Sequence, residues 1–341
     1  MSIVQATARL VASRFTTVSF GLLMMLWSPI IGQEKPERFW VAGRYDGNRI
    51  VVYFNEVKFR GTMNSRARKI APPVVDGFFN PVELPADYVA GFQKTGDAEH
   101  FGVGDRYDLM LGNGTIATVK LTALLGCETD EEVGNDSFIG ALATVETGNL
   151  ASTRGYYAVR RHQEPPGDGV RRGPTTTAEF LKFAALRDEP IRFDVETQIA
   201  ALLDQRMKTE ATDAEKRVAG SAAPALRVQP FQVADGSLRY YVRAEWKSGM
   251  EKDSQYLYTL AAWITPLPSL RILAVEKGTS AGYGIEDGLP DLLNVVDLGA
   301  GRTGVIFQVS YGESIQLELA EYRDGAGIQA MRLLQSLSVA E

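Results

Sequence analysis

Short runs of alternating hydrophobic and polar residues, separated by turn residues, dominate this chain. Alternation with a period of two predicts β-strands that bury one face and expose the other. The clearest run is 116–125, where Val119 and Leu121 alternate with Lys120 and Thr122. In the first half of the chain, the pattern predicts strands at 39–45, 50–59, 107–111, 116–125, 138–145 and 156–160.

Turn residues lie between several of these strands. Asp46-Gly47-Asn48 and Asn113-Gly114 each separate two predicted strands, and such sequences favour the tight turns of β-hairpins. The segment 60–85 instead contains several prolines, which cannot donate to a strand ladder. We therefore expect an irregular loop there.

The pattern changes after 163–174, a segment rich in proline and glycine that predicts a linker. A short helix is predicted at 178–186. A longer helix is predicted to begin at the N-cap residue Asp194, because hydrophobic residues then recur at helical spacing. Charged residues replace this hydrophobic stripe over 208–217. The stripe comprises Val195, Ile199, Leu202, Leu203 and Met207.

A second region of predicted strands begins near residue 226, and Asp235-Gly236 supplies its first turn. Its strands are predicted at 228–233, 238–246, 256–264, 270–275, 292–298, 305–311 and 315–322. The chain is therefore predicted to be mainly β, with two antiparallel β domains joined by a short helical connector. The predicted parts are an N-terminal β domain at 33–162, a linker and helical connector at 163–225, and a C-terminal antiparallel β domain at 226–341.

Residues 1–32 predict a secretory signal peptide. Arg9 and Arg14 precede the uncharged run 15–32, and the segment contains no acidic residue. A positively charged start, a short apolar core and a small residue at a cleavage point are typical of such signals. We therefore expect an exported protein, periplasmic or extracellular and bacterial. Cleavage after Gly32 and retention of the segment as a membrane anchor both remain open.

Composition narrows the classes of partner. The formal net charge is −6, and an acidic chain is a poor partner for nucleic acid, whose phosphates require a basic face. Cys127 is the only cysteine, so no internal disulfide can form, and its apolar neighbours predict a small buried residue. An exported chain without disulfides fits a bacterial envelope protein that binds an envelope glycan or a protein partner.

Two glycine-rich segments match enzyme motifs, but their context predicts loops. Gly278-Thr-Ser-Ala-Gly282 has the pattern of a nucleophile elbow, yet His100 and His162, the only histidines, both precede it, and a turn follows it. Gly299-Ala-Gly-Arg-Thr-Gly304 has the dinucleotide-binding pattern, but a strand follows where a helix is required. The sequence thus predicts no catalytic residue, no metal ligand and no cofactor.

The second of these motifs also carries a resemblance. Asp297-Leu-Gly-Ala-Gly-Arg-Thr-Gly304, followed by Ile315-Gln-Leu-Glu-Leu-Ala-Glu-Tyr-Arg-Asp-Gly325, resembles the hairpins of secreted FG-GAP-like repeat proteins. The resemblance covers only about residues 297–325 and implies a β-hairpin. In that family an Asp-x-Asp-x-Asp-Gly turn binds calcium. Here Gly299 and Gly301 occupy the second and third acidic positions, and Asp297 alone cannot supply six oxygen ligands.

One predicted strand of the second β region supplies the candidate ligand-binding residues. Arg239, Tyr241 and Arg243 lie on the face opposite Val242 and Trp246, because strand side chains alternate. An exposed tyrosine between two arginines suits recognition of a carbohydrate or peptide. The alternative is that this row forms the solvated face of an outer strand.

By elimination, the sequence favours an exported, non-catalytic cell-envelope protein that binds a ligand or scaffolds an assembly. One alternative is an envelope hydrolase that uses carboxylates alone, because two acidic side chains suffice for glycoside cleavage. The other is a structural subunit of an envelope assembly, which would expose an apolar patch to its neighbours.

Overall fold

The computed structural model describes fourteen segments of the chain. They are residues 37–58, 68–69, 80–86, 89–90, 102–112, 114–128, 138–150, 155–162, 193–219, 223–247, 256–281, 289–311, 314–327 and 330–340. The predicted signal at 1–32, the linker at 163–174 and the short helix at 178–186 lie outside these residues. Contacts group Arg38–Glu341 into one compact unit. No helix within the described ranges has the length and apolarity needed to cross a bilayer.

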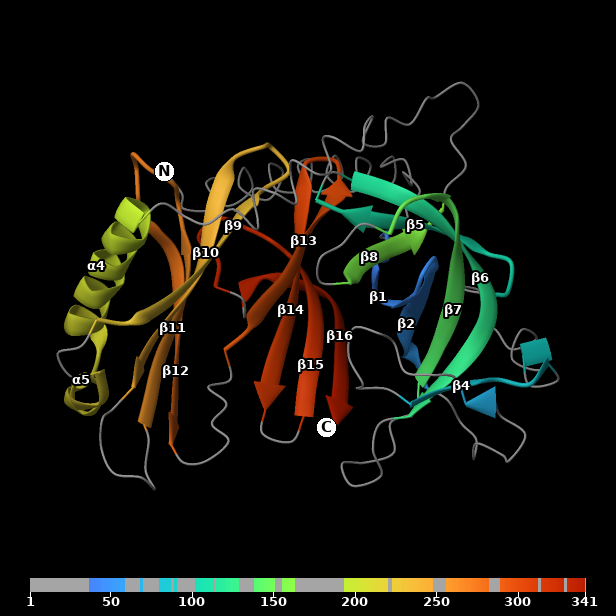
Figure 1. The fold of residues 1–341 in the computed structure, drawn as a ribbon, viewed down its shortest axis with the longest axis horizontal. Helices are drawn as coiled ribbons and strands as arrows, with labels where there is room; N and C mark the ends of the chain where they lie inside the picture. The colour runs from blue at the N-terminus through green and yellow to red at the C-terminus, as the bar shows by residue number, and fades with distance from the viewer. Residues whose placement is uncertain are drawn as a thin grey trace, which may run out of the picture. The chain divides into compact units, whose positions relative to one another are not determined.

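The prediction of a mainly β protein with antiparallel sheets is confirmed. Among the strands of the first sheet, β6, β5, β8, β1, β2 and β7 pair in that order, and β7 pairs again with β6, so they close into a ring (Figure 1). The hairpins predicted at Gly47-Asn48 and Asn113 are confirmed by β1–β2 and β5–β6 pairing. The first sheet comprises β1 (Trp40–Asp46), β2 (Arg49–Lys58), β3 (Arg68–Lys69), β4 (Asn80–Glu83), β5 (Arg106–Leu111), β6 (Gly114–Glu128), β7 (Phe138–Gly148) and β8 (Tyr156–Arg161).

Large side chains fill the interior of this ring. The rings of Trp40 and Phe54 pack edge to face with centroids 5.3 Å apart, and Tyr107 lies 5.8 Å from both. The alternation predicted at 116–125 holds as far as Thr122, since Val119 and Leu121 are buried in this core whereas Thr122 is exposed. A shift in the ladder between Leu121 and Ala123 then brings Leu124, instead of Ala123, into the core. Burial of alternate residues therefore fixes the register of each strand.

The prediction of an irregular loop at 60–85 is wrong for part of that segment. β4 pairs with β6 from Asn80 to Glu83, and the two-residue strand β3 pairs with the end of β4. Pro81 lies opposite Cys127 in the β4–β6 ladder, and the described residues of β3 pair only with Val82 and Glu83.

The described residues in the second half of the chain form two further antiparallel sheets and two helices. One sheet has the order β9-β10-β11-β12, and the other has the order β13-β14-β15-β16. The strands are β9 (Ala225–Gln232), β10 (Leu238–Lys247), β11 (Tyr256–Ile264), β12 (Ile272–Ala281), β13 (Asp291–Gly299), β14 (Arg302–Tyr311), β15 (Ser314–Glu321) and β16 (Arg332–Ala340). The helices are α4 (Phe193–Glu210) and α5 (Asp213–Ala219).

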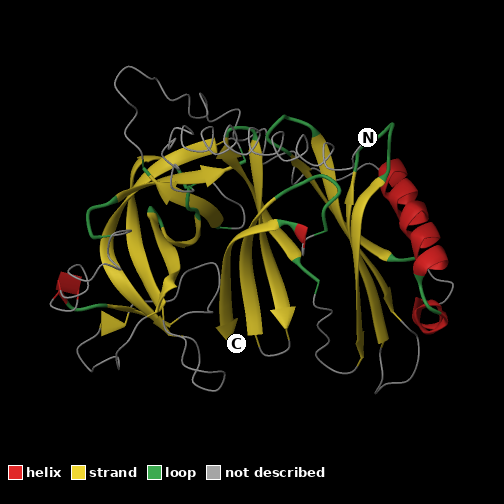
Figure 2. Cartoon of the chain, turned by 180° about the vertical axis from the view of Figure 1, so that it is seen from behind, coloured by secondary structure: helices red, strands yellow, loops and turns green. Residues whose placement is uncertain are grey.

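The stripe predicted for the longer helix is confirmed, and it packs on the β9–β12 sheet. Helix α4 begins at Phe193, so Asp194 lies in its first turn, where a negative charge is favourable. Val195, Ile199, Leu203 and Met207 are buried in one cluster with side chains from β10 and β11. Figure 2 shows the helix lying along one face of this sheet.

The other face of the β9–β12 sheet packs against the β13–β16 sheet. Aromatic side chains meet at this interface, with ring centroids 4.8–6.2 Å apart. The β9–β12 sheet contributes Phe231, Tyr241 and Trp263, and the β14–β15 region contributes Phe307 and Tyr322. Edge-to-face and tilted geometries are the favoured arrangements for aromatic pairs. The interface is therefore a dense aromatic core rather than a solvated surface.

The second face of the β13–β16 sheet packs against the outside of the ring. Ile306 and Leu317 share a buried cluster there with Val51 and Tyr53. The side-chain amide of Gln335, only 5% exposed, accepts from the Val41 amide and donates to the Tyr53 carbonyl at 2.7 Å. Two buried layers of side chains thus cover the β13–β16 sheet, and its polar atoms find partners across them.

Strand β16 was not predicted, and a bulge explains why. Leu319 pairs with Gln335 but Ala320 pairs with Leu333, so Leu334 is an extra residue in the ladder. The insertion breaks the period-two pattern, and the spacing of Leu334 and Leu337 no longer indicates a strand.

The two glycine-rich motifs have different outcomes. The loop predicted at Gly278–Gly282 is wrong as far as Ala281, because Ser280 lies in β12 and pairs with Leu257. The hairpin predicted at Gly299–Gly304 is confirmed, since Gly299 pairs with Arg302 across a two-residue turn. Ala300 and Gly301 in this turn have φ of 54° and 73°, the positive values of a type I′ turn.

Ala300 is the only described non-glycine residue with a positive φ, and this generates a stability prediction. Ala300→Gly should raise the free energy of unfolding by about 0.5–1 kcal/mol, because glycine adopts this conformation without steric cost. Urea unfolding of the full chain provides the measurement. Ala234→Gly, in the β9–β10 turn, is the control and should lower stability or leave it unchanged. A destabilised Ala300→Gly variant would contradict the turn assignment.

Candidate functional site

The candidate residues Arg239, Tyr241 and Arg243 lie on β10 as predicted, but the expected exposure of Tyr241 is wrong. Tyr241 is 1% exposed, and its hydroxyl donates to the carbonyl of Pro290. The physical reason is the β13–β16 sheet, which covers the face that the sequence pattern left for solvent. Tyr241 therefore belongs to the core between two sheets.

The two flanking arginines join these sheets at their margins. The Arg239 guanidinium donates to both carboxylate oxygens of Asp324, at 3.0 and 2.6 Å. The Tyr322 hydroxyl donates to the same carboxylate at 2.7 Å. The guanidinium holds the pKa of Asp324 below its ordinary value. Arg243 contacts Asp291 at 3.0 Å. These charges are engaged in paired contacts between strands, which is a structural role.

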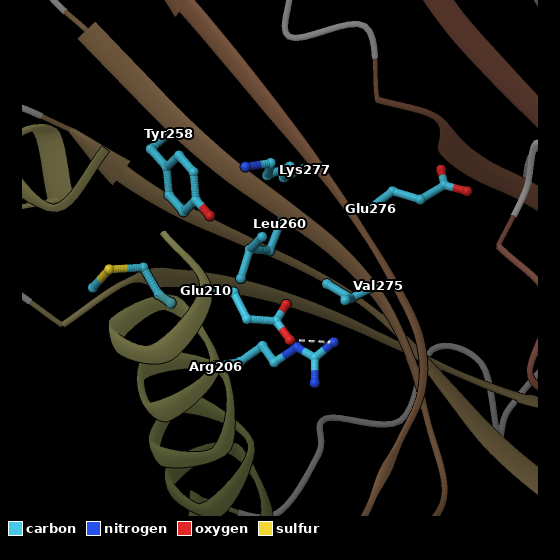
Figure 3. Close-up of a pocket in the computed structure, with 8 residues that line it drawn as sticks. Arg206, Glu210, Tyr258, Leu260, Val275, Glu276 and Lys277 are labelled. Atoms are coloured by element: carbon cyan, nitrogen blue, oxygen red, sulfur yellow. Dashed lines mark ion pairs between the residues drawn. The ribbon is translucent and has the colours of Figure 1, made fainter. Parts of the chain in front are cut away.

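A pocket of about 260 Å³ lies elsewhere, between the end of α4 and strands β11 and β12 (Figure 3). Its apolar part is formed by Met207, Leu260 and Val275, the first two of which are almost completely buried. Charged side chains border this apolar part. An apolar surface with a few polar groups around it is the usual composition of a small-molecule site.

The strand register explains which β12 side chains reach the pocket. Lys277 pairs with Leu260 across the β11–β12 ladder, and Val275 lies two residues away on the same face. Glu276, between them, points away from the other labelled side chains in Figure 3. On α4, Arg206 and Glu210 are one turn apart and form an ion pair of 2.6 Å.

Tyr258 is the most informative residue of the pocket. Its side chain is 1% exposed and its ring packs against Trp246, with centroids 5.6 Å apart. Its hydroxyl has no hydrogen-bond partner among the described residues, and Figure 3 shows it directed toward Leu260 and Glu210. Burial, with Glu215 and Glu210 nearby, raises its pKa to about 12, so the hydroxyl retains its proton.

A capping box next to the pocket fixes the position of Lys277. The Glu215 carboxylate accepts from the Thr212 amide at 2.6 Å, and the Thr212 hydroxyl accepts from the Glu215 amide at 3.3 Å. Glu215 also accepts from the Lys277 ammonium at 2.9 Å. The Thr212 amide and Lys277 together lower the pKa of Glu215, which stays ionised and anchors the ammonium.

The sequence analysis missed this pocket, although one signal was present. Thr212-Asp-Ala-Glu215 has the S/T-x-x-E pattern of a capping box and marks the start of α5. No sequence signal placed Tyr258 beside α4, because that contact joins elements far apart in the chain. Within the described ranges, no group of three or more His, Cys, Asp and Glu side chains could hold a metal ion.

A second polar cluster lies on the ring. Asp108 on β5 is 1% exposed, and its carboxylate lies 2.6 Å from Nδ1 of His162 and 3.5 Å from Nε of Arg160. Two basic side chains thus compensate the buried carboxylate, as burial of a charge requires. No local pattern predicts this contact, since 54 residues separate Asp108 from His162.

The capping box generates a pH-dependent prediction. The folded pKa of Glu215 is depressed, so its stabilising contribution is present above its ordinary value of 4.5 and is lost as the pH falls through the lower folded value. Thr212→Ala should lower the free energy of unfolding by about 1 kcal/mol at pH 7.

Urea unfolding measures both effects. The stability difference between the wild-type protein and Glu215→Gln should be present at neutral pH and shrink in acid. Thr212→Ser retains the capping hydroxyl and is the matched control, expected to remain close to the wild type. A difference independent of pH would contradict the role of the Glu215 carboxylate.

Comparison with known proteins identifies no relative of this chain, so the chemistry of the pocket is inferred from its geometry. No protein-family model matches the chain, and no curated protein or solved structure matches it significantly.

Proposed function

We propose that this chain is an exported, non-catalytic binding protein that takes a small amphipathic ligand in the pocket between α4 and β11–β12. Export is supported by the charge and hydropathy pattern of residues 1–32. Binding is supported by the apolar surface of Met207, Leu260 and Val275, bordered by polar side chains. A ligand with an apolar body and one polar end suits a pocket that has an apolar surface and a polar border.

The unpartnered hydroxyl of Tyr258 is the observation that carries the proposal. The hydroxyl oxygen is not one of the fully enclosed polar atoms that lack a partner, so this donor opens to the space of the pocket. A ligand that displaces water from the pocket must therefore offer this hydroxyl an acceptor, because a donor left unpaired costs free energy. The raised pKa keeps the group a neutral donor at physiological pH.

A hydrolase that uses carboxylates alone is the second candidate, and one observation favours it. Glu318 on β15 is partly buried, and burial together with the nearby carboxylate of Glu276 raises its pKa. A carboxyl group with a raised pKa near a second carboxylate is the arrangement that glycoside hydrolysis requires.

The binding proposal predicts that 1-hexanol binds the full-length protein saturably, as measured by ligand-observed NMR titration. Tyr258→Phe should weaken this binding about three- to tenfold, the effect of losing one hydrogen bond. Tyr240→Phe is the matched control, since Tyr240 is buried in the same cluster but does not line the pocket. Equal affinities in the two variants would exclude Tyr258 as a ligand contact.

The proposal also predicts no release of nitrophenol from a panel of nitrophenyl glycosides. The wild-type protein and Glu318→Gln should be equally inactive. Turnover by the wild type that disappears in Glu318→Gln would establish the hydrolase instead.

A further inference from the structure

Ion pairs border the pocket at both of its ends. At one end, Arg206 pairs with Glu210 at 2.6 Å. At the other end, Lys277 pairs with Glu215 at 2.9 Å and lies near Tyr258, whereas Glu276 on the same strand points away (Figure 3). The end with Tyr258 and Lys277 therefore presents hydrogen-bond donors to the space between them.

The geometry of the β11–β12 ladder brings these two donors together. Tyr258 pairs with Thr279, and Leu260 pairs with Lys277, so Tyr258 and Lys277 are diagonal neighbours on one face of the sheet. Diagonal neighbours are about 7–8 Å apart at their backbones, within reach of long side chains. A single acceptor group can contact both side chains.

The Lys277 ammonium has bonding capacity left for a ligand. It donates one hydrogen bond to Glu215 at 2.9 Å, and an ammonium carries three donors. Glu215 is itself held by the Thr212 amide, so it positions the ammonium at the rim. Because the ion pair with Glu215 already orders the Lys277 side chain, a ligand that binds there loses less conformational entropy of that side chain, which favours binding.

We infer that the pocket binds a short-chain aliphatic monocarboxylate, with its head between the Tyr258 hydroxyl and the Lys277 ammonium and its chain across Leu260 and Val275. This inference rests on the proposed function and specifies its ligand. A carboxylate accepts from both donors, and bonds to an ionised donor are the stronger kind. The volume of about 260 Å³ provides room for a small ligand.

Three probes of equal chain length test the head group: hexanoate, 1-hexanol and hexylammonium. Their affinities for the full-length protein can be measured by ligand-observed NMR at pH 7. Hexanoate should bind at least about tenfold more tightly than 1-hexanol, because it adds a charge-assisted bond. Hexylammonium should bind least tightly, because its ammonium head offers no acceptor to the Tyr258 hydroxyl or to Lys277.

Variants identify the residue responsible. Lys277→Met keeps the length of the side chain and removes its charge, so it should abolish the preference for hexanoate over 1-hexanol. A far-UV circular dichroism spectrum equal to that of the wild type shows that the variant is folded. Lys208→Met is the control, because Lys208 lies on the exposed side of α4 in an ion pair with Asp204 and should retain the full preference.

The outcomes separate the two proposals. Tighter binding of 1-hexanol or hexylammonium would overturn the carboxylate assignment and leave the binding function in place. A preference for hexanoate that survives in Lys277→Met would overturn the assigned head-group position. No saturable binding of any probe would overturn both the inference and the proposed function.

Discussion

Burial of the β13–β16 sheet on both of its faces is the constraint on which the rest of this structure depends. The ring of the first sheet covers one face and the β9–β12 sheet covers the other. Because both layers are buried, polar groups within them need partners inside the protein. Asn294 does so by donating to the Tyr156 carbonyl at 2.6 Å, and Gln229 by donating to the Leu292 carbonyl at 3.3 Å.

The same constraint explains which sequence predictions succeeded. Hairpins and the α4 stripe depend on local patterns, and the sequence predicted them because turn residues and helical spacing act over a few residues. Whether a strand face is exposed depends on what packs against it, and that partner lies far away in the chain. Tyr241 illustrates the difference, since its alternation was predicted correctly while its exposure was not.

The pocket arises where local and distant features meet. Helix α4 needs its hydrophobic stripe to dock on the β9–β12 sheet, and Met207 is the last member of that stripe. Beyond it the chain turns into the capping box of α5, which brings Glu215 to Lys277. The capping box could be predicted from four consecutive residues, whereas the unpartnered Tyr258 hydroxyl could be recognised only once β11 and α4 were placed together.

The bond that Gln335 makes across the sheets has a consequence for synthesis of the protein. Its amide contacts Val41 and Tyr53, which precede it by 294 and 282 residues. A ribosome completes β1 and β2 long before it reaches β16, so the Val41 amide must wait for its side-chain partner until nearly the whole chain has emerged. Contacts of such long range slow folding, because the intervening chain must be ordered first. The bonds of Gln335 to Val41 and Tyr53 can therefore form only after β16 has been synthesised, so a chain cut before β16 lacks this link between the first sheet and the β13–β16 sheet.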